Sequence, residues 1–132
     1  MNVNINDLQP SQLFINAEKF AVIMDGFDPA AIKPIPMTKM GDRMVLTDGH
    51  THALVAYLSG ASEIPVYWDE DELDLDAYAI CLGWCMEEGV HSVADLADRL
   101  LPPDKYEILW IKRCEEMQHR LAHDRGECDC HE

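Results

Sequence analysis

The chain has 132 residues, of which 48% are hydrophobic and 27% charged, values typical of a single globular domain. It contains 25 Asp and Glu against 10 Lys and Arg, which gives a net charge of −15. Unaided binding to a phosphodiester backbone requires Lys and Arg to displace counterions, so this charge argues against nucleic acid as a ligand. A small anionic ligand stays compatible with it, because one local positive pocket suffices. No stretch approaches about 20 apolar residues and no basic-then-apolar leader is present, so we expect neither a membrane span nor export.

The cysteines predict a reducing compartment. An odd number of thiols without a leader favours free cysteines and a cytoplasmic location. The five are Cys81, Cys85, Cys114, Cys128 and Cys130. The first three fall on apolar helix faces, where cysteine usually packs as a small hydrophobe. Cys128, Cys130 and His131 could contribute to a metal site together with His119 or His123, although a closed zinc site needs four ligands on a folded frame.

The first half of the chain predicts a small mixed sheet. Val3 and Ile5 alternate with Asn, as in a short strand. Asn16 is a suitable N-cap for a helix with an apolar stripe of Phe20, Ile23, Met24 and Phe27, ending near Gly26. Residues 35–40 and 43–47 predict an antiparallel hairpin, since Gly41-Asp42 suits a two-residue turn. Residues 43–68 then predict a strand, a tight turn, a buried helix and a second strand, with a right-handed crossover.

The second half of the chain predicts three helices. Apolar residues recur at helical spacing over residues 77–85, then over residues 93–100 behind a Ser92 cap, and finally over residues 106–121. The fold class is therefore α+β, with a core at 1–68, a helical extension docked on it at 69–123, and a flexible tail at 124–132. We expect Trp84 and Trp110 to be mostly buried by that docking.

The segment Asp69–Asp76 contains six acidic residues in eight positions. Its simplest interpretation is a solvated connector anchored by Leu73 and Leu75. A site for a basic partner or a divalent cation is the alternative, although no calcium-loop spacing supports the cation.

The segment Thr47–His52, which reads TDGHTH, is the sharpest functional candidate. A glycine between a buried strand and a helix permits a tight turn and a close approach by a ligand. The first N–H groups of such a helix, at the positive end of its dipole, form an anion site. Thr51 adds a hydroxyl, and His50 and His52 add ring donors. The alternative is an ordinary strand-to-helix turn whose histidines are packing or surface residues.

A resemblance to a known family is carried by residues 34–68, which read PIPMTKMGDRMVLTDGHTHALVAYLSGASEIPVYW. Residues 8–27, LQPSQLFINAEKFAVIMDGF, extend it toward the N-terminus. This half of the chain resembles the ParB/sulfiredoxin-like superfamily. The resemblance implies a glycine turn that binds nucleotide phosphates, with CTP hydrolysis, sulfinate reduction and serine phosphorylation among the activities of its members. The cofactor it implies is a nucleotide (ATP, ADP or CTP), with or without Mg²⁺.

The resemblance places Gly49, His50 and Thr51 on the phosphate-binding turn. It matches Asp48 to an acidic residue of the kinase branch, and Glu18 to the carboxylate that acts there as a base, so both are candidate catalytic residues. His52 stands where the family usually has Arg, and it carries a charge only part of the time near neutral pH. The sulfiredoxin cysteine has no counterpart here, which argues against sulfinate reduction. The implied function is binding of a nucleotide or phosphorylated small molecule, with phosphoryl transfer or nucleotide hydrolysis as the associated chemistry.

Other functional classes compete with this interpretation. The His50-Thr51-His52 pattern also resembles the strand-end pair of amidohydrolases, but that barrel takes about 250 residues. Residues 92–113 begin like a helix-turn-helix, yet they present Asp104 and Glu107 where a groove-reading helix needs basic or amide side chains, so we expect no sequence-specific DNA binding. The remaining alternatives are a small metal-binding protein and a non-catalytic interaction module that has lost the phosphate-binding Arg. The module would use the C-terminal helices for a protein partner or a homodimer.

Overall fold

The computed structural model describes residues 1–126 and shows a five-stranded mixed sheet. In spatial order its strands are β1 (Asn2–Asn4), β6 (Glu63–Trp68), β4 (Ile35–Met40), β5 (Arg43–Leu46) and β2 (Leu8–Gln9). The central strand β4 runs parallel to β6 and antiparallel to β5. The outer strands differ, since β1 is antiparallel to β6 and β2 is parallel to β5. Together with the helices, this sheet confirms the α+β class.

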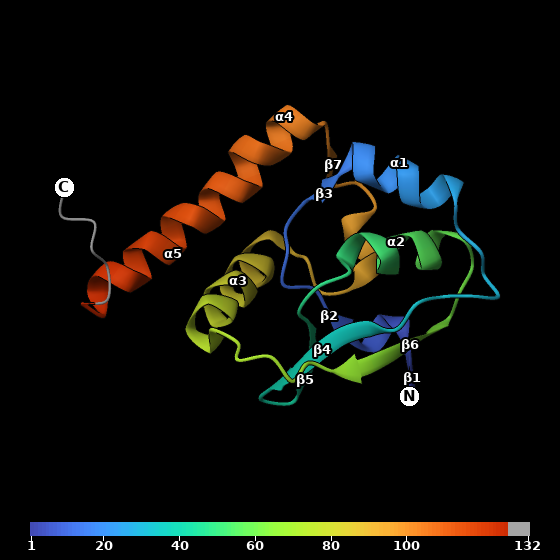
Figure 1. Cartoon of the computed structure of the whole chain (residues 1–132), viewed down its shortest axis with the longest axis horizontal. Helices are drawn as coiled ribbons and strands as arrows, with labels where there is room; N and C mark the ends of the chain where they lie inside the picture. The colour runs from blue at the N-terminus through green and yellow to red at the C-terminus, as the bar shows by residue number, and fades with distance from the viewer. Residues whose placement is uncertain (127–132) are drawn as a thin grey trace.

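Two helices cover the sheet. α2 (His50–Leu58) lies between the sheet and α1 (Ala17–Asp25), and both helices begin on the same side of the molecule (Figure 1). Residues 53–56 of α2 are fully buried, because this apolar run meets protein on all sides. α1 buries no residue completely. Its predicted cap is confirmed, since Asn16 Oδ1 accepts hydrogen bonds from the N–H groups of Glu18 and Lys19.

The hairpin and the strand–turn–helix–strand segment are present within one residue of their predicted bounds. The expected handedness, however, does not apply to the latter. β4 lies between β5 and β6, and β5 is antiparallel to β6, whereas the right-handed rule concerns parallel strands. The first predicted strand also ends early, because Ile5–Asp7 forms a 3-10 turn (η1) behind the side-chain cap of Asn4.

The extension contains one helix fewer than expected. After α3 (Leu75–Glu88), residues Val93–Leu96 form only a 3-10 turn (η2), and Leu100–Leu101 form the strand β7. Residues 97–98 form a turn after η2, and β7 then pairs in parallel with β3 (Ile15–Asn16), so the expected helix at 93–100 is replaced by a 3-10 turn, a turn and the start of a strand. Pro102 disfavours a helical conformation of the residue before it, and the pairing with β3 supplies the backbone hydrogen bonds that a helix would have given.

The last helix is longer than predicted. α4 (Pro103–Tyr106), the π-helical segment η3 (Glu107–Ile111) and α5 (Lys112–Asp124) follow one another without a break (Figure 1). Trp110 is buried as expected, whereas Trp84 is half-buried and meets it edge-on at 6.0 Å between ring centroids. The helix continues through Asp124, and Arg125 pairs with Asp74 at 2.9 Å, so the flexible tail does not start at 124. Cys128, Cys130 and His131 lie outside the described residues.

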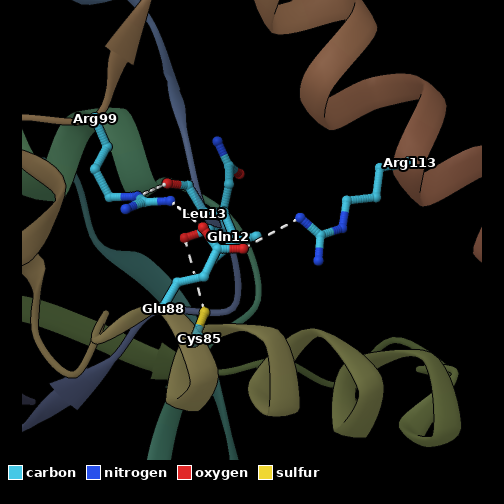
Figure 2. Close-up of polar contacts among 6 residues, drawn as sticks. All are labelled: Gln12, Leu13, Cys85, Glu88, Arg99 and Arg113. Carbon is cyan, nitrogen blue, oxygen red and sulfur yellow. Dashed lines mark hydrogen bonds and ion pairs between the residues drawn. The ribbon is translucent and has the colours of Figure 1, made fainter.

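A polar network joins the extension to the N-terminal segment (Figure 2). Arg99 Nε donates to the carbonyl of Leu13 at 2.6 Å, and its terminal nitrogen pairs with Glu88 at 2.6 Å. Arg113 contacts the other oxygen of Glu88 at 3.3 Å. The apolar core is also shared, because Leu8 and Leu54 belong to the same buried cluster as Leu96, Trp110 and Met117. In residues 1–126, no helix is long and apolar enough to cross a membrane.

Candidate functional site

The turn between β5 and α2 has the geometry that its glycine predicts. Gly49 is the N-cap of α2 and has φ +74°, in the left-handed region. A Cβ at this position would lie 2.8 Å from Cγ2 of Ile35, so both conformation and space require glycine. Asp48 Oδ1 accepts a hydrogen bond from the Gly49 N–H at 2.8 Å. The strand, turn and helix are therefore arranged as the sequence predicts.

The start of α2 presents hydrogen-bond donors that the protein does not use. The first intrahelical bond runs from the Ala53 N–H to the Gly49 carbonyl at 2.9 Å. Within residues 1–126, the N–H groups of His50, Thr51 and His52 have no acceptor, and no side chain caps the helix. The Thr51 hydroxyl has no hydrogen-bond partner there either, although Thr51 is only 5% exposed. Because no fully buried side-chain oxygen or nitrogen of residues 1–126 lacks a partner, this hydroxyl oxygen is reached by solvent. An accessible hydroxyl next to unpaired helix N–H groups is well suited to an anion.

His50 has a different role from the expected one. Its ring is buried, and Nε2 accepts a hydrogen bond from the Ser11 N–H at 2.9 Å. The Ser11 hydroxyl in turn donates to the Leu46 carbonyl at 2.7 Å. Burial lowers the pKa of His50 to about 4, so the ring is neutral and fixes the 10–12 segment against β5. Nε2 of His50 is therefore not a donor to a ligand. The proton of the neutral ring lies on Nδ1, which has no hydrogen-bond partner within residues 1–126, and the backbone N–H is unpaired as well.

His52 is exposed and belongs to a small group of positive charges. Burial and the charges of Lys19 and Lys33 lower its pKa, while Asp48 raises it. The charge of Lys19 also lowers the pKa of His50, and Lys19 lies in the first turn of α1, which packs beside α2 (Figure 1). We call Lys19, Lys33 and His52 the cationic cluster. His52 and Lys33 line a groove of about 440 Å³ between α1 and the 26–33 loop, whose walls include Val22, Phe27 and Ile32.

The sequence does not indicate Lys19 and Lys33 as residues of this site. Arg43 and Lys39 are nearest to the turn in sequence, but Arg43 donates to the Gln9 side chain at 2.8 Å and Lys39 is an exposed residue of β4. Lys19 comes close through the packing of α1 against α2. A weak signal for it existed, because it follows the predicted N-cap of α1 by three residues and so had to lie at the start of that helix.

The two candidate catalytic carboxylates are not brought together. Glu18 is exposed in the first turn of α1. Asp48 lines a second groove, beside Tyr67 and Trp68, which differs from the groove that His52 lines. Neither groove is lined by Gly49 or Thr51. One is lined by Asp48, before this glycine, and the other by His52, after it. Within the described part of the chain, no group of three or more His, Cys, Asp or Glu side chains could hold a metal ion.

Comparisons with known proteins support the fold and leave the activity open. No family model matches the chain. The uncharacterised protein MJ0188 of Methanocaldococcus jannaschii is 31% identical over 96 residues, which cover 71% of this chain and 32% of that protein. The chain therefore matches only about a third of the length of this relative. The crystal structure of protein Atu1540 from Agrobacterium tumefaciens is similar with a TM-score of 0.51 and 14% identity, covering 75% of this chain and 62% of that one. At this identity the likeness concerns the fold alone, an α+β fold with a mixed sheet.

Proposed function

We propose that this protein binds the phosphate of a nucleotide or of another phosphorylated small molecule at the start of α2. The Thr51 hydroxyl, which is unpaired and reached by solvent, lies beside three unpaired helix N–H groups, and this is the observation that carries the proposal. In a chain with a net charge of −15, the cationic cluster gathers three of the few basic side chains beside this one helix start. The helix dipole, the unpaired hydrogen-bond donors and the positive charges then all stabilise the same phosphate group of the ligand.

The groove beside His52 supplies room for the rest of such a ligand. Its volume of about 440 Å³ falls in the usual range for small-molecule sites. Apolar side chains of α1 and the 26–33 loop form its walls, and Lys33 and His52, the residue after Thr51, also line it. This arrangement suits a ligand with one anionic end and one flat or apolar end, as a nucleotide has. The resemblance to the ParB/sulfiredoxin-like superfamily implies the same ligand class.

Binding is better supported than catalysis. Phosphoryl transfer needs an acceptor held in line with the phosphate and cations around it. Lys19 and Lys33 can supply charge, but Glu18 is exposed and Asp48 lines the other groove. A phosphoryl-transfer role for either carboxylate requires that ligand binding bring it to the phosphate.

Calorimetric titration with ATP, ADP and CTP, each with and without Mg²⁺, tests the proposal. Thr51→Val removes the hydroxyl and keeps the shape, and we expect about tenfold weaker binding, the effect of one hydrogen bond to a charged group. The double variant Lys19→Gln/Lys33→Gln should weaken binding at least as much. Its matched control is Lys39→Gln/Lys105→Gln, which changes the net charge equally at exposed positions away from the turn. If no nucleotide binds, or if both double variants weaken binding equally, the proposed site is wrong.

The pH dependence of binding gives an independent check. Because the pKa of free His52 lies below 6.5, this ring is mostly neutral at pH 7, and a bound anion must raise its pKa. Affinity should therefore increase as pH falls below 7, and reach its limit once the free ring is protonated. His52→Arg should bind more tightly at pH 7.5 and lose this part of the pH dependence. Equal pH profiles for the wild type and His52→Arg would show that His52 does not contact the ligand.

A further inference from the structure

A second groove lies at the end of β6 and is independent of the proposed phosphate site. We call it the aromatic–acidic groove. It measures about 570 Å³. It is lined by Pro36, Asp48, Tyr67, Trp68, Asp69, Glu70 and Asp71. Tyr67 is 49% exposed and Trp68 is 48% exposed, so two adjacent large aromatic side chains face solvent here. Exposed apolar surface that is gathered beside charged residues marks binding surfaces more often than isolated exposed side chains do.

The acidic side chains of this groove have no basic partner within residues 1–126. Further along the same acidic run, Asp74 and Asp76 pair with Arg125 at 2.9 Å. Within residues 1–126, by contrast, Asp48, Asp69, Glu70 and Asp71 form no ion pair. No basic side chain lines the groove. The unneutralised half of the acidic run is therefore the half that lies beside the exposed aromatic rings.

Asp69 is fixed in position at the centre of the groove. The Thr47 hydroxyl donates to Asp69 Oδ2 at 2.7 Å, and the Asp71 N–H donates to Oδ1 at 2.9 Å. The backbone N–H of Asp69 is held by the Met37 carbonyl at 2.8 Å. Trp68 is the last residue of β6 and Asp69 follows it directly, and both side chains line the groove. A ligand that uses both groups loses little of its binding free energy to ordering them.

We propose that the aromatic–acidic groove docks a segment of a partner protein that is rich in Arg and Lys. Carboxylates beside exposed aromatic faces complement guanidinium and ammonium groups, which pair with the acids and stack on the rings. Arg suits the groove best, since its planar group can contact Trp68 and a carboxylate at once. The net charge of −15 favours the approach of a basic partner and opposes an acidic one.

Fluorescence anisotropy with a labelled nonapeptide of alternating Arg and Ser tests this proposal, with a Glu/Ser peptide of the same length as the negative probe. Trp68→Ala should weaken binding of the basic peptide about threefold to fivefold, the usual size of a solvent-exposed cation–π contact. Trp68→Phe should keep most of the affinity, because it retains an aromatic face. Glu70→Gln/Asp71→Asn should weaken binding by up to about tenfold, and the affinity should fall as NaCl is raised.

The control for charge is Asp104→Asn/Glu107→Gln, which removes two exposed acids from the start of the last helix. Unchanged binding by this control, with weakened binding by the two groove variants, supports the proposal. An equal loss in both double variants means that the peptide responds to net charge alone, and overturns it. Displacement of the peptide by spermine at equal charge concentration, with the same variant dependence, would make a free polyamine the ligand and also overturn it. Each outcome is separate from nucleotide binding, since none of the substituted residues belongs to the turn or the cationic cluster.

Discussion

Acid should destabilise this protein through one buried histidine. His50 has a pKa of about 4 in the folded chain against 6.5 for an ordinary histidine, and burial is the main cause. Between pH 6.5 and 4, His50 is therefore protonated in the unfolded chain but neutral in the folded chain. The free energy of unfolding falls as pH falls through this window. From these two pKa values, the loss relative to pH 8 is about 2 kcal/mol at pH 5 and about 3 kcal/mol at pH 4. Below pH 4 both states are protonated, and this contribution stops changing.

Urea unfolding at pH 8, 6, 5 and 4, followed by circular dichroism, measures this loss directly. His50→Gln removes the titrating ring and keeps a side chain that can accept a hydrogen bond. It should be less stable than the wild type at pH 8, because the Ser11 N–H has lost its best acceptor. The gap between the two proteins should narrow as pH falls to 4. Asp74, whose pKa the Arg125 hydrogen bond lowers, contributes only at lower pH and equally in both proteins. A constant gap from pH 8 to pH 4 would refute the argument that His50 is held neutral.

Two further predictions concern stability. Gly49→Ala should destabilise the fold by at least about 2 kcal/mol, because the new Cβ meets Ile35 of β4. Gly89→Ala has nearly the same positive φ but no atom within 4 Å of the new Cβ, so it should cost only about 1 kcal/mol. Equal losses of stability in thermal unfolding would show that the contact with β4 is unimportant. Arg99→Met should cost about 2 kcal/mol, because it leaves the Leu13 carbonyl without its donor and Glu88 with only its contact to Arg113. Arg120→Met, on the exposed face of α5, should change stability by less than about 0.5 kcal/mol. Similar midpoints for both variants in urea would contradict the role of this network.

Local signals in the sequence were sufficient to predict the elements that begin at a cap or a glycine turn. Asn16 caps α1, and Gly49 begins α2, because the physical requirements of caps and left-handed turns involve only a few adjacent residues. The hairpin at Gly41 follows for the same reason. The prediction of a helix over residues 93–100 is wrong. The Ser92–Asp95 capping box is a genuine local signal for a helix start, but pairing with a distant strand overrides it. β7 depends on pairing with β3, and periodicity carries no information about a partner so far along the chain.

The candidate site divides in the same way. The sequence identifies Gly49 and Thr51, because a glycine between an apolar strand and an apolar helix defines a helix N-terminus. It does not distinguish the environments of His50 and His52. The His50 ring is buried against Ser11 and His52 is exposed, because two residues on a short helix can face opposite environments. Lys19 enters the site only through the packing of α1 on α2, about 30 residues away in sequence. Charge proximity of this kind requires the tertiary fold.

The hydrogen bonds between the N-terminal segment and residues 90–99 have a consequence for synthesis of the chain. The Leu13 carbonyl accepts a hydrogen bond from Arg99, which is 86 residues later in the chain, and the Gln9 side chain donates to the Val90 carbonyl, 81 residues later. At translation rates of about 5–20 residues per second, these early segments emerge several seconds before their partners. In that interval Leu8, Leu13 and Ile15, all fully buried in the finished fold, lack the part of their core that Val90, Leu96 and Trp110 supply. The nascent chain is consequently most prone to aggregation before its last third has left the ribosome, and it is in this interval that a chaperone would act on it.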